Sequence, residues 1–162
     1  MKHIKKIFEE FEELGIEKDE LTIDFLNRLL ANHFVLFLKV YKFHWDVVGS
    51  GFGPTHEYLN ELYDALFENV DEIAERIRQL DGNPVGTMKG YLELTEIPEY
   101  DEETKPSEKV IFETILRDYE FIIRELRNFL STEDLDNGTV NMLEDMIMKK
   151  EKDAWLIRSR TK

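Results

Sequence analysis

The sequence contains no cysteine, and this absence excludes several kinds of chemistry at once. Disulfide bonds, thiolate metal sites and cysteine nucleophiles are all impossible. Proline and glycine are also scarce, with 4 and 8 residues among 162, and they cluster between stretches of regular apolar spacing. A chain of this length with 42% hydrophobic residues can bury the core of one domain. We therefore expect a single folded domain over residues 1–162, with residues 1–20 as an N-terminal extension.

Positive charge is in short supply. Lysine and arginine together number 21 against 35 aspartates and glutamates, which gives a formal net charge of −14. A strongly acidic surface repels the phosphates of nucleic acids. Basic residues gather at the two ends of the chain, at Lys2, Lys5, Lys6, Arg158, Arg160 and Lys162. We interpret both ends as solvated termini and expect DNA binding to be weak or absent.

Long apolar runs are missing as well. We find no stretch that approaches the ~18 apolar residues of a membrane-spanning helix. The N-terminal segment MKHIKKIFEEFEEL alternates charged and apolar residues, whereas a signal peptide has a continuous apolar core. We therefore expect a cytoplasmic protein without membrane contact.

Apolar residues recur at intervals of three and four along four stretches, which predicts four long helices and an all-α fold. The stretches cover residues 22–48, 55–80, 107–130 and 139–158. The first and last connections are short and predict antiparallel hairpins, whereas the middle one is a crossover of about 26 residues, typical of the ferritin-like four-helix bundle. Apolar residues in this crossover predict a short helix there. A further short amphipathic helix is predicted ahead of the bundle by Ile4, Phe8, Phe11 and Leu14.

Two of the four histidines bracket the glycine-rich break in FHWDVVGSGFGPTH. His44 and His56 stand at the end of one predicted helix and the start of the next, and neutral imidazole is the commonest protein ligand for transition metals. A lone histidine is more often structural, so the pair alone is only a candidate metal site. His33 lies roughly 16 Å from His44 along the same helix, too far to share an ion, and we predict a structural role for it.

Asp71 and Glu75 are four residues apart, so their carboxylates project from one side of the second helix. Read alone, they form a solvated acidic stripe in which Glu72 or Glu75 pairs with a neighbouring arginine. However, they continue a stripe that is separate from the Leu/Ile core face of this helix. The stripe consists of His56, Asn60, Phe67, Asp71 and Glu75.

The distance between the two halves of this stripe decides how they can act together. His56 and Asp71 are separated by roughly 22 Å of helix, whereas metal–ligand bonds are only about 2 Å long. One chain therefore cannot place both on one ion, but two antiparallel chains related by a two-fold axis would create two equivalent sites. A metal site inside one bundle would use Glu-x-x-His pairs, and no glutamate stands three residues before any histidine.

The segments HWDVVGSGFGPTH and VDEIAERIRQLDGNPVG resemble those of the Dps proteins, the mini-ferritins named as DNA-binding proteins from starved cells, and LEDMIMKKEKDAW resembles the family's last helix. The resemblance implies a dodecamer built from two-fold dimers, with a di-iron ferroxidase centre at each end of the dimer interface. Fe(II) would be oxidised there, preferentially by hydrogen peroxide, and ferric iron stored in the cavity, which protects against oxidative damage. The implied ligands are His44 and His56 of one subunit with Asp71 and Glu75 of its neighbour.

Three further features are read through this resemblance. Asn60 stands where some members have an aspartate ligand, which implies a looser second iron position. Trp45 is placed to pass an electron or quench a radical, although core packing explains it equally well. Acidic residues near the last connection either line iron pores or stabilise the N-terminus of a helix; they are Glu133, Asp134, Asp136, Glu144 and Asp145.

Two other functions remain open at the level of sequence. One is a nucleoid or DNA-binding protein with minor ferroxidase activity. The other is a structural or zinc-binding shell, because Zn(II) accepts the same histidine and carboxylate ligands.

Overall fold

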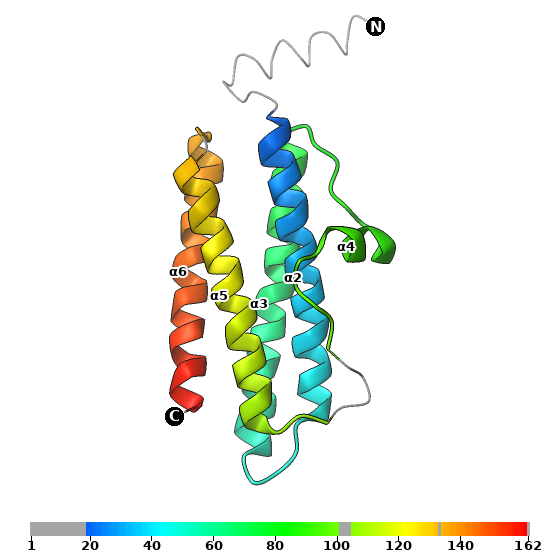
Figure 1. Ribbon diagram of the computed structural model, residues 1–162, viewed down its shortest axis with the longest axis vertical. Coiled ribbons are helices and arrows are strands. Elements are labelled where there is room, and N and C mark those ends of the chain that lie inside the picture. Colours follow the sequence, from blue (N-terminus) through cyan, green and yellow to red (C-terminus); the bar gives the residue numbers. More distant parts are fainter. Residues whose placement is uncertain (1–18, 101–104, 133, 162) are drawn as a thin grey trace, which may run out of the picture.

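The computed structural model describes residues 19–100, 105–132 and 134–161. Four long helices in this part of the chain form a bundle, and a short helix lies on its side (Figure 1). In chain order the helices are α2 (Glu20–Asp46), α3 (Phe52–Gln79), α4 (Met88–Leu94), α5 (Glu108–Thr132) and α6 (Asn137–Arg160). The predicted all-α bundle with a short helix in its crossover is confirmed. The helix predicted around Ile4, Phe8, Phe11 and Leu14 lies outside the described residues.

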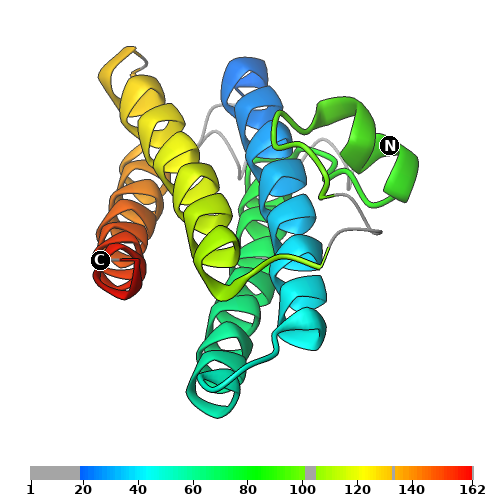
Figure 2. The same cartoon turned by 60° about the horizontal axis from the view of Figure 1, so that its bottom comes forward.

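The long helices pair as predicted from the lengths of the connections. α2 and α3 form one antiparallel hairpin and α5 and α6 form the other, and the crossover with α4 runs along α2 (Figures 1 and 2). Large apolar side chains from all four long helices fill the space between them. Among those almost completely removed from solvent are Leu26, Phe43, Leu59, Ile73, Ile115, Ile122, Leu143 and Ile157. Burial of this apolar area is the main force that holds the four helices together.

α2 corrects one expectation. It is long and apolar enough, by length and composition, to cross a membrane, with a mean hydropathy of 1.3 over 18 residues. α2 is this apolar because it packs against α3, α4 and α5 and therefore carries apolar residues on several sides. More than half of that apolar segment, 56%, is buried inside the bundle.

The helix starts lie two or three residues earlier than the apolar periodicity predicts, except for α5, and each shift has a local cause. The carboxylate of Asp19 caps α2 by accepting from the backbone N–H of Leu21 and Thr22. α3 begins at Phe52, because Pro54 is tolerated in a first turn, where no N–H is needed. Asp136 caps α6 in the same way as Asp19 caps α2.

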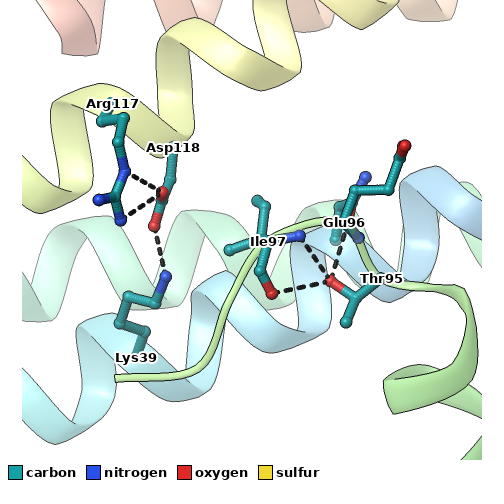
Figure 3. Close-up of polar contacts among 7 residues, drawn as sticks. Lys39, Thr95, Glu96, Ile97, Arg117 and Asp118 are labelled. Atoms are coloured by element: carbon teal, nitrogen blue, oxygen red, sulfur yellow. Dashed lines mark hydrogen bonds and ion pairs between the residues drawn. The ribbon is translucent and has the colours of Figure 1, made fainter. Parts of the chain in front are cut away.

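The crossover is fastened to α2 by two asparagines. The side-chain oxygen of Asn27 accepts from the backbone N–H of Val85 at 2.7 Å, and that of Asn32 accepts from the N–H of Glu96 at 2.8 Å. The Thr95 hydroxyl, which accepts from the N–H of Ile97, tightens the turn that follows α4 (Figure 3). These bonds satisfy backbone groups that a long loop would otherwise leave unpaired.

An ion pair joins α2 to α5 inside the bundle. The ammonium of Lys39 lies 2.5 Å from a carboxylate oxygen of Asp118, and Arg117 donates to the other oxygen at 3.2 Å (Figure 3). Burial lowers the pKa of Lys39, and the hydrogen bond and charge of Asp118 oppose this shift. Within the described residues, the bundle interior thus holds a salt bridge and no cluster of metal ligands.

His33 is structural, as predicted. Its ring is completely buried, and its Nδ1–H donates to the carbonyl of Leu29 at 2.8 Å. Burial, together with the nearby charge of Lys150, holds the pKa of His33 well below its ordinary value, so the ring is neutral.

Candidate metal centre

The hairpin between α2 and α3 brings His44 and His56 together. The two imidazole rings stack with their centroids 3.6 Å apart and an angle of 20° between their planes. Each ring is also bonded to the backbone of the other residue: His44 Nδ1 lies 2.8 Å from the carbonyl oxygen of His56, and His56 Nδ1 lies 2.9 Å from that of His44. The two histidines thus form a reciprocal pair at the junction of two helices.

These bonds fix which nitrogen of each neutral ring carries the hydrogen. A carbonyl oxygen only accepts, so each Nδ1 must carry the hydrogen and donate it. In the neutral ring, Nε2 then keeps its lone pair and is free to bind a metal ion. A ligating histidine typically has its other nitrogen held by a carbonyl or carboxylate in this way, because the bond sets the tautomer and the orientation of the ring. The chain therefore presents two preorganised imidazole donors.

Aromatic side chains surround the histidine pair. The ring of Phe52 stacks on His56 with centroids 4.9 Å apart, and Tyr63 meets His44 edge-on at 5.2 Å. The ring of Tyr41 lies between those of Tyr63 and Trp45, with centroid distances of 4.7 Å to Tyr63 and 4.4 Å to Trp45. Trp45 is 61% exposed, so the core-packing interpretation of this residue is wrong for a single chain. Its role in passing electrons or quenching radicals stays a prediction.

Asn60 is already engaged in hydrogen bonds. Its side-chain oxygen, the only atom of the amide able to bind a metal, accepts from the Tyr63 hydroxyl at 2.5 Å. Its side-chain nitrogen donates to Asp64 at 2.7 Å. A metal ion bound by Asn60 would therefore have to compete with the phenol of Tyr63. Sequence reasoning missed Tyr63, although its position three residues after Asn60 places both on one face of α3.

Asp71 and Glu75 lie toward the opposite end of α3, and both are exposed. α3 is continuous from Phe52 to Gln79, so the helical distance of roughly 22 Å from His56 to Asp71 holds. Among the described residues, no three histidine, aspartate or glutamate side chains are placed to hold one ion. Within one chain the structure therefore keeps the histidines and the carboxylates apart. The proposed pairing of Glu72 or Glu75 with Arg76 or Arg78 is also absent from this part of the chain.

Arg76 instead ties the carboxylate end of α3 to α6. Its guanidinium lies 2.5 Å from the Asp136 carboxylate and donates to the Thr139 hydroxyl at 3.1 Å. Partial burial opposes ionisation of Asp136, but hydrogen bonds from Thr139 and Arg76 outweigh it and lower the pKa of this carboxyl. Asp136 thus stabilises the N-terminus of α6, which was one of the two interpretations of the acidic residues near the last connection. Glu133 lies outside the described residues, and pore lining by Asp134, Glu144 and Asp145 stays a prediction.

Comparison with known proteins agrees with this architecture. The family model of the ferritin-like domain matches residues 23–161. The chain is 38% identical to DNA protection during starvation protein 2 of Bacillus anthracis, across 85% of this chain and 94% of that protein. It is similar to the crystal structure of a Dps protein from Bacillus brevis, with a TM-score of 0.84 and 30% identity over 88% of this chain and 96% of that one.

A Dps protein from Vibrio cholerae, described as a member of a broad superfamily of ferritin-like diiron-carboxylate proteins, is equally similar in structure. Its TM-score is 0.84, with 28% identity over 88% of this chain and 90% of that one. The fold and the family match together define a ferritin-like four-helix-bundle protein. Within that class, the chain belongs to the Dps family.

Proposed function

We propose that this protein is a mini-ferritin that oxidises Fe(II) at di-iron ferroxidase centres between subunits and stores the ferric product inside a hollow homo-oligomer, a dodecamer in the cytoplasm. The observation that carries the proposal is the reciprocal pair of His44 and His56, whose Nε2 atoms are left as fixed donors. Imidazole combined with carboxylate oxygen suits Fe(II). The description of the Vibrio cholerae Dps protein as a diiron-carboxylate protein supports the same metal.

Fe(II) is the substrate of this reaction, and each half of the proposed centre has its own task. His44 and His56 of one subunit would hold Fe(II) through Nε2, and Asp71 and Glu75 of the neighbour would supply negative charge. Carboxylates bind Fe(III) more strongly than Fe(II), so they favour loss of an electron. Two Fe(II) ions together provide the two electrons that convert one hydrogen peroxide and two protons into two water molecules. Peroxide is then consumed without release of hydroxyl radical, which would protect the cell from oxidative damage.

A second copy of the chain is the expected partner. Under a two-fold axis that brings the histidine end of α3 onto the carboxylate end of its copy, the middle of α3 lies near the axis and meets itself. Phe67 stands there on the same stripe and is 57% exposed. A nearby hollow of about 300 Å³ between α2 and α4 is also lined by exposed apolar residues, namely Leu38, Trp45, Met88 and Leu92. Exposed apolar surface of this kind marks an interface.

The dimer can be tested without metal. Phe67→Glu would place two like charges against each other across the axis, so it should convert the oligomer into monomers in analytical ultracentrifugation. Glu68→Gln is the matched control, because Glu68 is the next residue on the exposed side of α3, and it should leave the assembly unchanged. Persistence of the full assembly in Phe67→Glu would refute the proposed axis.

The function itself is tested by adding Fe(II) and then hydrogen peroxide, followed by size exclusion with iron detection. We expect iron to co-elute with a shell-sized oligomer and peroxide to be consumed at one molecule per two Fe(II). Precipitation of iron beside an intact protein peak would refute the proposal. Tight Zn(II) binding without Fe(II) turnover would instead establish the zinc-binding shell.

DNA binding is the second candidate, because the Bacillus anthracis relative is named for DNA protection. The net charge of −14 opposes it, since binding to the phosphate backbone depends on clustered positive charge. A gel shift at low salt separates the two functions. We expect no retarded complex, whereas a salt-sensitive complex would make DNA binding part of the function.

A further inference from the structure

The N-terminus of α3, which carries His56, lacks a cap of its own. The residue in the capping position is Gly51, which has no side chain to accept a hydrogen bond, and the first turn contains no acidic residue. The first turn of a helix leaves N–H groups unpaired and carries partial positive charge, so it normally attracts an oxygen acceptor or an anion. The N–H of Phe52 is bonded to the carbonyl of Gly49, and Pro54 has no N–H, but the local sequence supplies neither a side-chain acceptor nor a negative charge at the start of α3.

The carboxylate of Glu108, from α5, lies beside this first turn. Glu108 Oε1 accepts from the Thr55 hydroxyl at 3.0 Å. Glu108 Oε2 lies only 2.7 Å from the point where a Cβ atom on Gly51 would stand. Thr55 is buried, with 1% of its surface exposed, and Glu108 is half-buried, so this contact is partly shielded from water. Glu108 is also the first residue of α5, which places its single charge beside the N-termini of two helices.

This contact bears directly on the histidine pair. Thr55 precedes His56, so the position of the first turn of α3 sets both the His56 ring and the His56 carbonyl that holds His44. We propose that Glu108 is a positioning residue for the metal centre: it fixes the start of α3 from α5 and thereby keeps the two imidazole rings in their reciprocal hydrogen bonds. The missing side chain of Gly51 leaves room for the carboxylate, and a Cβ atom there would force the end of the Glu108 side chain to shift.

Two pairs of variants test this inference. Glu108→Ala removes the contact, whereas Glu108→Gln keeps an acceptor for Thr55. Gly51→Ala puts a methyl group where the carboxylate stands, whereas Gly53→Ala, two residues on, meets nothing within 4 Å. The first readout is nitrogen-15 NMR of the metal-free oligomer, in which Nδ1–H donation makes His44 and His56 report one tautomer. The second is Co(II) affinity, measured by absorption of the bound ion.

We expect Glu108→Ala to give mixed tautomers and about 10–100-fold weaker Co(II) binding, the usual cost of losing an outer-shell contact. Gly51→Ala only displaces the end of the Glu108 side chain, so it should change both readouts in the same direction but by less. Glu108→Gln and Gly53→Ala should stay within a few-fold of the parent protein. A fixed tautomer and unchanged affinity in Glu108→Ala would overturn the inference. So would an equal loss in Glu113→Ala, the exposed glutamate on the same helix.

The inference deepens the proposed metal site, and the two remain separable. If the variants disturb the tautomers while the parent protein fails to oxidise Fe(II), the positioning role stands and the ferroxidase proposal falls. If Glu108→Ala does not fold, Thr55→Val tests the same bond, because it replaces the hydroxyl with a methyl group of similar size that cannot donate. Retention of the single tautomer in Thr55→Val would then overturn the role of Glu108.

Discussion

The two ends of α3 carry the two halves of the proposed metal centre, and they are built in opposite ways. At the N-terminal end, His56 is half-buried and stacked on His44, and both rings are held by backbone carbonyls. At the other end, Asp71 and Glu75 are exposed, and among the described residues neither side chain has a hydrogen-bond partner or an ion-pair partner. At one end the ligand side chains are held before any metal arrives, whereas at the other Arg76 ties the helix to α6 and the two carboxylates stay in solvent.

This difference shows where the order of the site comes from. Neutral imidazole donors tolerate burial and gain from a fixed orientation, whereas a buried carboxylate pair without a cation would be costly. The chain can therefore complete the histidine half during folding but leaves the carboxylate half in water. A second subunit and the iron itself would fix the orientation of the two carboxylates.

The largest effect is expected on metal chemistry, and both ends should share it. His56→Ala removes a nitrogen ligand, and Asp71→Asn removes a charged oxygen ligand without changing shape. Each should slow Fe(II) oxidation by at least about 100-fold, since even outer-shell losses cost 10–100-fold. Stopped-flow absorption of the ferric product measures the rate. Full activity in either variant would remove that end from the site.

The next largest effect is a difference in folding stability between variants at the two ends of α3. His56→Ala removes the bond from the His56 ring to the His44 carbonyl and the stacking of the two rings, and it should lower the free energy of unfolding by about 1–3 kcal/mol. Asp71→Asn and Glu75→Gln change exposed side chains and should stay within about 0.5 kcal/mol. Urea unfolding followed by circular dichroism distinguishes them. Equal destabilisation at both ends would contradict the contrast drawn between them.

A smaller effect is expected from the anchor of the carboxylate end. Arg76→Met should cost about 1–2 kcal/mol of stability, because it removes hydrogen bonds to Asp136 and Thr139. Lys89→Met serves as the control, since its ion pair with Glu93 is exposed and is worth about 0.5 kcal/mol or less. If both variants unfold at the same urea concentration, Arg76 does not anchor this end.

The smallest effect is a pH dependence at the same anchor. The pKa of Asp136 is lower in the folded protein than its ordinary value of 3.8. Its ionised form therefore stabilises the fold above pH 3.8, and this contribution disappears as pH falls through the lower folded pKa. The stability difference between the parent protein and Arg76→Met should shrink by less than about 1 kcal/mol on acidification below pH 4. A difference that grows instead would have the wrong sign.

The sequence predicts the bundle well because apolar spacing directly reflects which side of each helix is buried. The contacts that organise the metal centre are harder to predict. The carbonyl partners of His44 and His56 depend on how two rings meet across a glycine-rich turn. The bond between Thr55 and Glu108 joins residues 53 positions apart, and nothing in the local pattern marks it. The hydrogen bond between Tyr63 and Asn60 could have been predicted from the sequence, because the spacing of three residues on a helix brings the two side chains together.

If each metal centre is completed by two chains, inactive subunits that lack opposite halves of the centre should restore activity when they are mixed. One inactive protein would carry His44→Ala and His56→Ala, and the other Asp71→Asn and Glu75→Gln. After both are unfolded, mixed and refolded, every mixed dimer contains one intact site, so random pairing should restore about a quarter of the parent Fe(II) oxidation rate. If the mixture stays as inactive as its components while mixed oligomers are present, the site does not span two chains.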